Sequence, residues 1–353
     1  MDAVEFLREI VSIESLSGQE LMVATHIVSR MEMWGYARAY VDPAGNAVGM
    51  REQKNEAGEI DEEIVLLGHI DTVPGNIPVH IKDERLYGRG SVDAKGPFAA
   101  FVLAGIQAEL PPGRRIWVVG ATEEEAATSK GARYVKDHFD RPDFCIIGEP
   151  SGWDGVTLGY KGRILFNYRL DQDMGHTAGP EIGVAEQAVD FWNVLNHYAL
   201  EFNGKREKLF DQILPSIRTF HTSSDGITNT ADMKLGFRLP PDYDIQVLID
   251  LAEAHKGSAV ISHHGHEAAY HSKRTNPLAK AFSKGILLNG GKPKPKRKTG
   301  TSDMNVVGPH WNCPIIAYGA GDSKLDHTPN EHVIVDEFLK AIAVLKTVLS
   351  NKI

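Results

Sequence analysis

Histidine and carboxylate side chains follow four short apolar runs of this chain, close to the point where each run ends. The runs are Glu63–Gly68, Ile116–Ala121, Phe144–Gly148 and Pro314–Gly319. The residues after them are, in chain order, His69 and Asp71, Glu123–Glu125, Glu149 and His327. Imidazole and carboxylate groups bind Zn²⁺ without any thiolate, so this pattern indicates a site for a pair of zinc-like ions. Asp93, shortly before an amphipathic stretch that begins at Pro97, is a further candidate ligand.

The four runs lack polar alternation, which is typical of parallel strands that helices bury on both faces. Amphipathic stretches predict helices over Ser17–Gly35, Pro97–Leu110 and Val333–Leu349, with Ser17 as a candidate N-cap and Gly35 as the stop. This alternation predicts an open α/β sheet, in which ligand sites lie at the carboxyl ends of the strands. We therefore expect the candidate ligands to converge at one edge.

The middle of the chain has a different periodicity. Apolar and polar residues alternate over 163–171 and 231–239, which is typical of antiparallel strands with one solvated face. The stretch Pro180–Tyr198 between them has helical spacing. We predict a small α+β domain at 163–272, inserted into a catalytic α/β domain made of 1–162 and 273–353.

The composition is that of an ordinary globular protein, with 353 residues, 42% hydrophobic and 24% charged. A formal net charge of −9 argues against general binding to nucleic acid or anionic membrane. No apolar run approaches the ~20 residues that span a bilayer, and the N-terminus lacks the features of a secretory signal. The two cysteines, Cys145 and Cys313, lie in apolar runs, so we expect a reducing, cytoplasmic location.

Five motifs occur along the chain in the order Gly68–Pro74, Gly88–Gly96, Thr122–Glu125, Gly148–Ser151 and His327–Glu331. Together they resemble the signatures of the dizinc aminoacylase/carboxypeptidase metallopeptidase family, which includes acetylornithine deacetylase and succinyl-diaminopimelate desuccinylase. The resemblance implies a zinc-peptidase-like mixed sheet flanked by helices, with an inserted lid and dimerisation domain. It also implies a homodimer with two divalent ions per subunit, Zn²⁺ in first place and Co²⁺ as an alternative.

The resemblance assigns the metal ligands residue by residue. Asp93 would bridge the two ions, with His69 and Glu149 completing one site, and Glu125 and His327 the other. The family also tends to have a cis peptide after the bridging aspartate, here at Asp93–Ala94.

Other roles follow from the same resemblance. Glu124 would be the general base, although a shift of one residue would make Glu123 the base and Glu124 the ligand. Asp71 lies two residues after His69, on the same side of an extended chain, and would orient the imidazole.

The inserted domain supplies further candidates. His176, in Gly175–Gly179, resembles the family histidine that stabilises the oxyanion from the partner subunit; a surface turn is the alternative. Arg238, with Asn229 upstream, would bind a free α-carboxylate, unless it is a solvated strand arginine. The residues Gly300, Thr301 and Ser302 resemble a family loop that binds the same carboxylate. The cluster His263–His266 is interpreted as an exposed turn.

Four finer motifs narrow the substrate: Glu123–Arg133, Gly159–Arg163, Lys296–Asn305 and Gly321–His327. They resemble the branch of the family that releases lysine or ornithine from the C-terminal glutamate of an acidic amino-group carrier protein, in lysine and arginine biosynthesis. The run Lys292–Lys298 holds five cations spaced by two prolines, which predicts a stiff extended strip that steers the acidic carrier, or else a solvated basic loop. A small-molecule N-acyl-amino-acid deacylase and a non-catalytic metal-binding protein remain alternatives.

Overall fold

The computed structural model describes residues 2–176 and 179–353 and divides into two compact units. Unit 1 comprises the chain up to Gly159 together with His271–Arg297 and Ser302–Ile353. Unit 2 comprises Tyr160–Tyr270 together with Lys298–Thr301. The short second segment belongs to unit 2 because Gly300 and Thr301 are hydrogen-bonded to the backbone of Lys161.

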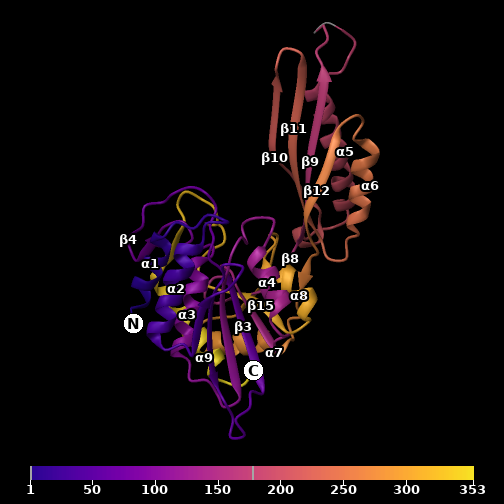
Figure 1. Cartoon of the computed structure of the whole chain (residues 1–353). Helices are drawn as coiled ribbons and strands as arrows, with labels where there is room; N and C mark the ends of the chain where they lie inside the picture. Colours follow the sequence, from indigo (N-terminus) through magenta and orange to yellow (C-terminus); the bar gives the residue numbers. More distant parts are fainter. Residues whose placement is uncertain (1, 177–178) are drawn as a thin grey trace. The chain divides into compact units, whose positions relative to one another are not determined.

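The sheet of unit 1 has the order β1-β2-β6-β3-β7-β15-β8-β13, and β14 pairs with β8 (Figure 1). The inner strands β6, β3, β7 and β15 are mutually parallel, while β2 and β8 are antiparallel to their neighbours. The bounds are β1 (Arg38–Val41), β2 (Ala47–Gln53), β3 (Glu62–His69), β6 (Arg114–Ala121), β7 (Phe144–Gly148), β8 (Gly155–Tyr160), β13 (Tyr270–His271), β14 (Lys294–Lys298) and β15 (Ile315–Tyr318). The mixed α/β fold class is confirmed, and its parallel strands are the four apolar runs.

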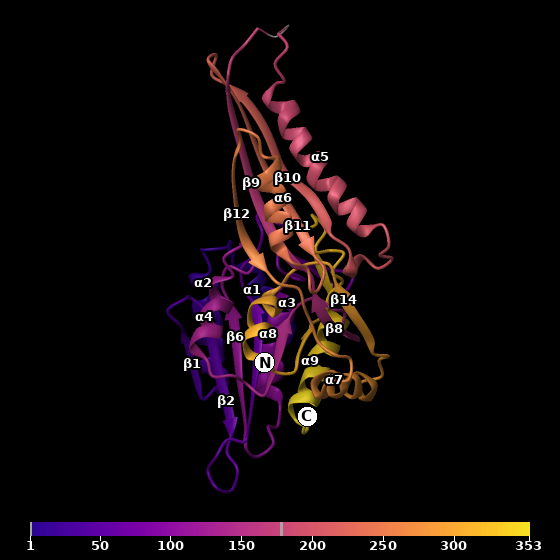
Figure 2. The ribbon, with the colours of Figure 1, turned by 90° about the vertical axis from the view of Figure 1, so that its right-hand side faces the viewer.

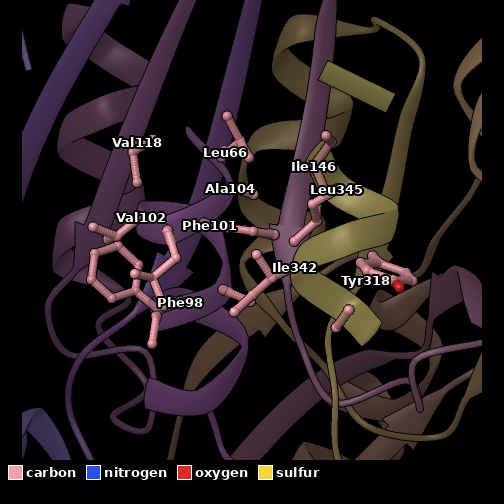
Figure 3. Close-up of a cluster of buried hydrophobic side chains, with 14 of the residues drawn as sticks. Leu66, Phe98, Phe101, Val102, Ala104, Val118, Ile146, Tyr318, Ile342 and Leu345 are labelled. Atoms are coloured by element: carbon pink, nitrogen blue, oxygen red, sulfur yellow. The ribbon is translucent and has the colours of Figure 1, made fainter. Parts of the chain in front are cut away.

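A buried helix, α3 (Lys95–Gln107), packs against this sheet and against the C-terminal helix α9 (Val335–Leu349). Figure 3 shows apolar side chains of α3 facing those of the strands and of α9: Phe98, Phe101 and Val102 with Leu66, Val118, Ile146, Ile342 and Leu345. Each phenylalanine buried there stabilises the fold by about 1.5–3 kcal/mol relative to an exposed one. This packing anchors the segment just before α3, which carries Asp93.

The other helices of unit 1 are α1 (Ala3–Ser12), α2 (Leu21–Trp34), α4 (Lys130–His138), α7 (Pro277–Leu288) and α8 (Asp303–Trp311). Gly35 ends α2 in the left-handed region at φ 92°, as predicted. The expected N-cap is wrong, because α2 begins after Glu20 and the Ser17 hydroxyl donates to Asp71 instead. A separate small sheet has the order β16-β5-β4, from β4 (His80–Lys82), β5 (Arg85–Tyr87) and β16 (His332–Ile334).

Unit 2 is a four-stranded antiparallel sheet in the order β10-β11-β9-β12, with two helices on one face (Figure 2). Its elements are β9 (Gly162–Asp173), α5 (Val184–Asn203), the short 3-10 helix η1 (Leu209–Asp211), β10 (Leu214–Ser224), β11 (Thr228–Leu239), α6 (Ile245–His255) and β12 (Val260–Glu267). The alternating residues of β9 and β11 point their apolar side chains into a core with α5 and α6. Within the described ranges, no helix is both long and apolar enough to cross a membrane.

Candidate metal centre

Unit 1 brings the carboxyl ends of three parallel strands to one edge of its sheet. β3 is paired with β6 through His69 and Ala121, and with β7 through Gly68 and Gly148. The glutamates that follow β6 and β7 therefore leave the sheet beside His69. Parallel register is the physical reason that residues more than fifty positions apart meet here.

Asp93 lies between two histidines. Its Oδ1 is 3.3 Å from Nε2 of His69, and its Oδ2 is 3.0 Å from Nε2 of His327. Burial alone would raise the pKa of Asp93, but the hydrogen bonds with His327 and His69 hold that pKa far below its usual value. Each carboxylate oxygen thus faces a different imidazole, which is the arrangement that a carboxylate shared between two ions needs. The Asp93–Ala94 peptide is cis.

Glu125 completes the cluster, with its Oε1 2.9 Å from Nε2 of His327. Hydrogen bonds with Asp93 and Glu125 raise the pKa of His327 to about 10. The donor atoms of His69, Asp93 and Glu125 all lie within 4.8 Å of one another, and no second group of this kind occurs in the described part of the chain.

The three consecutive glutamates have different surroundings. Glu123 points away from the cluster, because its carboxylate accepts a hydrogen bond from Thr128 Oγ1 at 2.7 Å and lies 3.7 Å from Lys130 Nζ. Glu125 faces His327. Of the two registers left open by the sequence, this geometry supports the one in which Glu125 is the ligand.

Glu124 is surrounded by other carboxylates. Burial raises its pKa well above the ordinary value, and the negative charges of Glu149 and Asp303 raise it further, while His69 opposes them. A carboxyl group whose pKa is raised above its ordinary value holds a proton more readily, which suits a group that accepts a proton and then returns it. Glu149 is itself buried, and it lies outside the compact group of three candidate ligands.

Asp71 connects His69 to the loop that carries the glutamates. Nδ1 of His69 lies 3.1 Å from the main-chain oxygen of Asp71 and 3.4 Å from its Oδ1. The Asp71 carboxylate also accepts the backbone N–H groups of Glu124 and Glu125, at 3.1 and 3.0 Å. This fully buried aspartate therefore orients the imidazole and two glutamates at once.

The sequence analysis missed Glu20. Its Oε1 accepts the backbone N–H of Glu123 at 3.0 Å and that of Gly18 at 2.8 Å. Glu123 has a φ of 58°, in the left-handed region that a glutamate rarely adopts, and such strain needs a surrounding structure that holds it. No sequence signal separates Glu20 from the surface glutamates of an amphipathic stretch.

The ligand types fit a pair of divalent transition ions. Imidazole nitrogens and carboxylate oxygens suit Zn²⁺ and Co²⁺, whereas Ca²⁺ and Mg²⁺ prefer oxygen ligands alone. In this cluster the protonated histidines supply positive charge to Asp93 and Glu125. Divalent ions would replace those protons as partners of the same carboxylates.

The substrate-binding candidates in unit 2 lie far apart on a single strand. Asn229 and Arg238 are nine residues apart on β11, opposite Gln172 and Arg163 of β9. At about 3.3 Å per residue this separation is about 30 Å, and the odd spacing places the two side chains on opposite faces. One copy of the chain therefore does not bring both residues to one small substrate.

His176 lies at the same end of the sheet as Asn229. It follows β9 by three residues and is exposed, and the neighbouring Met174 N–H bonds to the Ile227 oxygen. Thr177 and Ala178 of the same motif lie outside the described residues. Gly300 and Thr301 are held to Lys161 in unit 2, whereas Ser302 caps α8 in unit 1 by accepting the Met304 N–H. Their contact with substrate stays a prediction.

The sequence model of peptidase family M20/M25/M40 matches residues 65–351. The chain belongs to this family. As a member of this peptidase family, the protein is a hydrolase. The family that the five motifs resemble is therefore confirmed.

Two relatives carry names that specify a substrate. A LysW-lysine hydrolase from Deinococcus radiodurans is 43% identical, and the match covers 99% of this chain and 96% of the relative. A LysW-lysine/LysW-ornithine hydrolase from Sulfurisphaera tokodaii is 32% identical over 79% of this chain and 78% of its own.

Solved structures of M20 proteins share the fold. A metallo-carboxypeptidase from Sulfolobus solfataricus superposes with a TM-score of 0.82 at 20% identity and covers 99% of both chains. A dinuclear metal-binding M20 peptidase from Bacillus subtilis superposes with a TM-score of 0.71 at 14% identity, covering 99% of this chain and 96% of the other.

Proposed function

We propose that this M20 family member is a metal-dependent amide hydrolase that releases lysine or ornithine from the C-terminal glutamate of an acidic amino-group carrier protein. The reaction would be a step of lysine or arginine biosynthesis. The observation that carries the proposal is the Asp93 cluster, with two histidines on one carboxylate, in a chain similar over its length to an enzyme named LysW-lysine hydrolase.

Two divalent ions are proposed for the cluster, with Zn²⁺ expected and Co²⁺ as the alternative. Asp93 would be shared between them, and the remaining ligands would be His69 with Glu149 and His327 with Glu125. Bound there, divalent ions supply Lewis acidity, which lowers the pKa of water and polarises an amide carbonyl.

Glu124 is the proposed proton carrier. It would accept the proton of the attacking water and deliver it to the amine that leaves, a sequence that its raised pKa favours. Asp71 supports the reaction without contacting substrate, because it holds His69 and the backbone of Glu124 in one orientation.

A homodimer is proposed because unit 2 places two of its candidate substrate-binding residues, Asn229 and Arg238, far apart on one strand. With Arg238 and Asn229 at opposite ends of β11, one site is best assembled from Arg238 of its own subunit and from His176 and Asn229 of a second copy. The edge strand β10, which exposes Ile217 and Phe220, supports pairing between copies. The guanidinium of Arg238 would bind the carboxylate of the released amino acid, together with Gly300, Thr301 and Ser302.

A hydrolysis panel tests the proposal. The protein is treated with chelator, reloaded with Zn²⁺ or Co²⁺, and assayed on carrier-linked lysine, carrier-linked ornithine, N-acetyl-lysine and acetylornithine. We expect the highest kcat/KM on a carrier-linked substrate. Preference for an acetylated amino acid would make the chain a small-molecule deacylase, and a metal-loaded protein inactive on all four would be non-catalytic.

A further inference from the structure

Glu331 is a fully buried carboxylate whose four hydrogen bonds all go to one loop. Its Oε1 accepts the backbone N–H groups of Gly90, Val92 and Asp93, at 2.9, 3.0 and 3.1 Å. Its Oε2 accepts a hydrogen bond from Nη1 of Arg89 at 2.6 Å. The loop Gly88–Asp93 is therefore folded around this single side chain.

The site is built for a negative charge and not for a neutral amide. Three N–H groups that converge on one oxygen form an anion-binding nest, and a guanidinium on the second oxygen completes it. A glutamine could keep its oxygen toward the N–H groups, but its NH₂ group would then face the donors of Arg89. The loop needs the carboxylate for this reason.

Glu331 also ties together the two segments that meet at the cluster. It follows His327 by four residues, and its main-chain oxygen accepts the N–H of Gly88 at 3.3 Å. Immediately after it, β16 pairs with β5, which leads into the Gly88–Asp93 loop. The side chain thus links the segment carrying His327 to the loop carrying Asp93, whose side chains lie 3.0 Å apart.

We propose that Glu331 is a positioning residue that sets the placement of Asp93 against His327 and thereby the metal affinity of the cluster. This inference rests on the proposed function only in taking Asp93 and His327 as ligands. Glu331 is fully buried and its carboxylate is bonded to the loop, so we assign it no contact with the ions or the substrate. Residues that orient metal ligands change metal affinity by about 10–100-fold when they are replaced.

The experiment is a Zn²⁺ titration of chelator-treated protein by calorimetry with a competing chelator, on wild type and Glu331→Gln. A matched control is Glu62→Gln, which breaks the ion pair of Glu62 with the buried Arg114 at the opposite end of β3 from His69. We expect Glu331→Gln to bind Zn²⁺ about 10–100-fold more weakly, and Glu62→Gln to bind within about twofold of wild type.

A second measurement separates positioning from general stabilisation. If Glu331→Gln lowers the metal-free melting temperature as Glu62→Gln does but leaves Zn²⁺ affinity unchanged, the proposal is wrong. Should Glu331→Gln not fold, Glu331→Asp replaces it: the shorter carboxylate cannot span the three N–H groups and Arg89, so its Zn²⁺ affinity must also fall. Wild type that binds no Zn²⁺ would instead overturn the proposed function, and this inference with it.

Discussion

Carboxylates have two distinct roles around the metal centre. Asp93 and Glu125 face imidazole nitrogens, where positive charge is available to them. Asp71, Glu20 and Glu331 instead accept backbone N–H groups of the loops that carry those ligands. The first set is proposed to bind metal and the second set to orient the ligands, so substitutions in the two sets are expected to have different effects on metal content and activity.

The roles of the three glutamates can be separated by metal content. Glu124→Ala should retain about two ions per subunit while kcat falls about 10²–10⁴-fold, because Glu124 is proposed to move protons without holding metal. Glu125→Ala should lose an ion, and Glu123→Ala is the matched control that should do neither. Elemental analysis beside kinetics checks this. If Glu124→Ala loses the ion, the register is displaced by one residue.

Metal loading should release protons. His327 is protonated at neutral pH in the metal-free cluster, since hydrogen bonds with Asp93 and Glu125 raise its pKa to about 10. A ligand imidazole must be neutral, so each ion that binds His327 expels one proton, and the apparent affinity rises with pH up to about 10, by about tenfold per unit for each proton.

Calorimetric titrations with Zn²⁺ at pH 7.5, in buffers of different ionisation enthalpy, count these protons. His327→Gln should release about one proton fewer per subunit than wild type. An identical proton count in the two proteins would mean that His327 is not a ligand.

At the scale of single elements, the basic run is extended, as predicted, but it is part of a sheet. Lys294–Lys298 forms the strand β14, which pairs with β8. Lys294 pairs with Asp154 at 2.7 Å, and Lys296 Nζ donates to the Ser151 oxygen at 2.6 Å. The prolines therefore stiffen a sheet strand, and part of the positive charge is already engaged by unit 1.

Carrier steering can still be tested on β14 and the residues before it. Lys292→Glu with Lys294→Glu should raise KM for the carrier-linked substrate severalfold and leave kcat/KM for a short acyl-lysine unchanged, because long-range attraction acts on encounter. Lys296 is left intact for its contact with Ser151. In the pair of Lys294 with Asp154 the lysine side chain is 59% exposed and the aspartate side chain 16% exposed, so solvent screens the pair in part.

The matched control is Lys54→Glu with Lys352→Glu, an equal charge change on two exposed lysines outside the Lys292–Lys298 run. Wild-type KM for the carrier should also rise with salt. If the control pair raises KM for the carrier-linked substrate equally, the effect comes from net charge and not from the basic run. If neither pair raises this KM, the small-molecule deacylase becomes the favoured function.

At the scale of the whole molecule, the distance between Asn229 and Arg238 along β11 means that the proposed active site needs residues of two subunits. If His176 acts in the site of a second copy, heterodimers of His176→Ala and Glu124→Ala should regain part of the activity, since one of their two sites is intact. Differently tagged subunits, co-purified and assayed, provide the measurement.

Arg238→Ala mixed with Glu124→Ala is the matched control. Arg238 and Glu124 are proposed to serve the same subunit's site, so these heterodimers contain no intact site and should stay inactive. Activity in this control, or none in the His176 mixture despite proven heterodimers, would contradict the proposed assembly.

Much of the architecture was predictable because its signals are local. The unbroken apolar runs became the parallel strands, and the alternating stretches became β9 and β11 of unit 2. Ligand types at strand ends, together with five motifs, predicted a family that the comparison confirms. Hydrophobic periodicity depends only on residues that are near one another in the sequence, so it can be recognised without knowing which distant residues are in contact.

Tertiary structure decided what depends on distant partners. The sequence placed a cap at Ser17, but its hydroxyl binds Asp71, which lies fifty-four residues away. The orientation of Glu123 away from the cluster, the hydrogen bonds of Glu20 and the separation of Asn229 from Arg238 follow from loop conformation and strand pairing. In the sequence, a buried carboxylate that holds a loop cannot be told from a solvated one, because both are the same residue type. Only the N–H groups that the fold brings to the buried carboxylate distinguish the two.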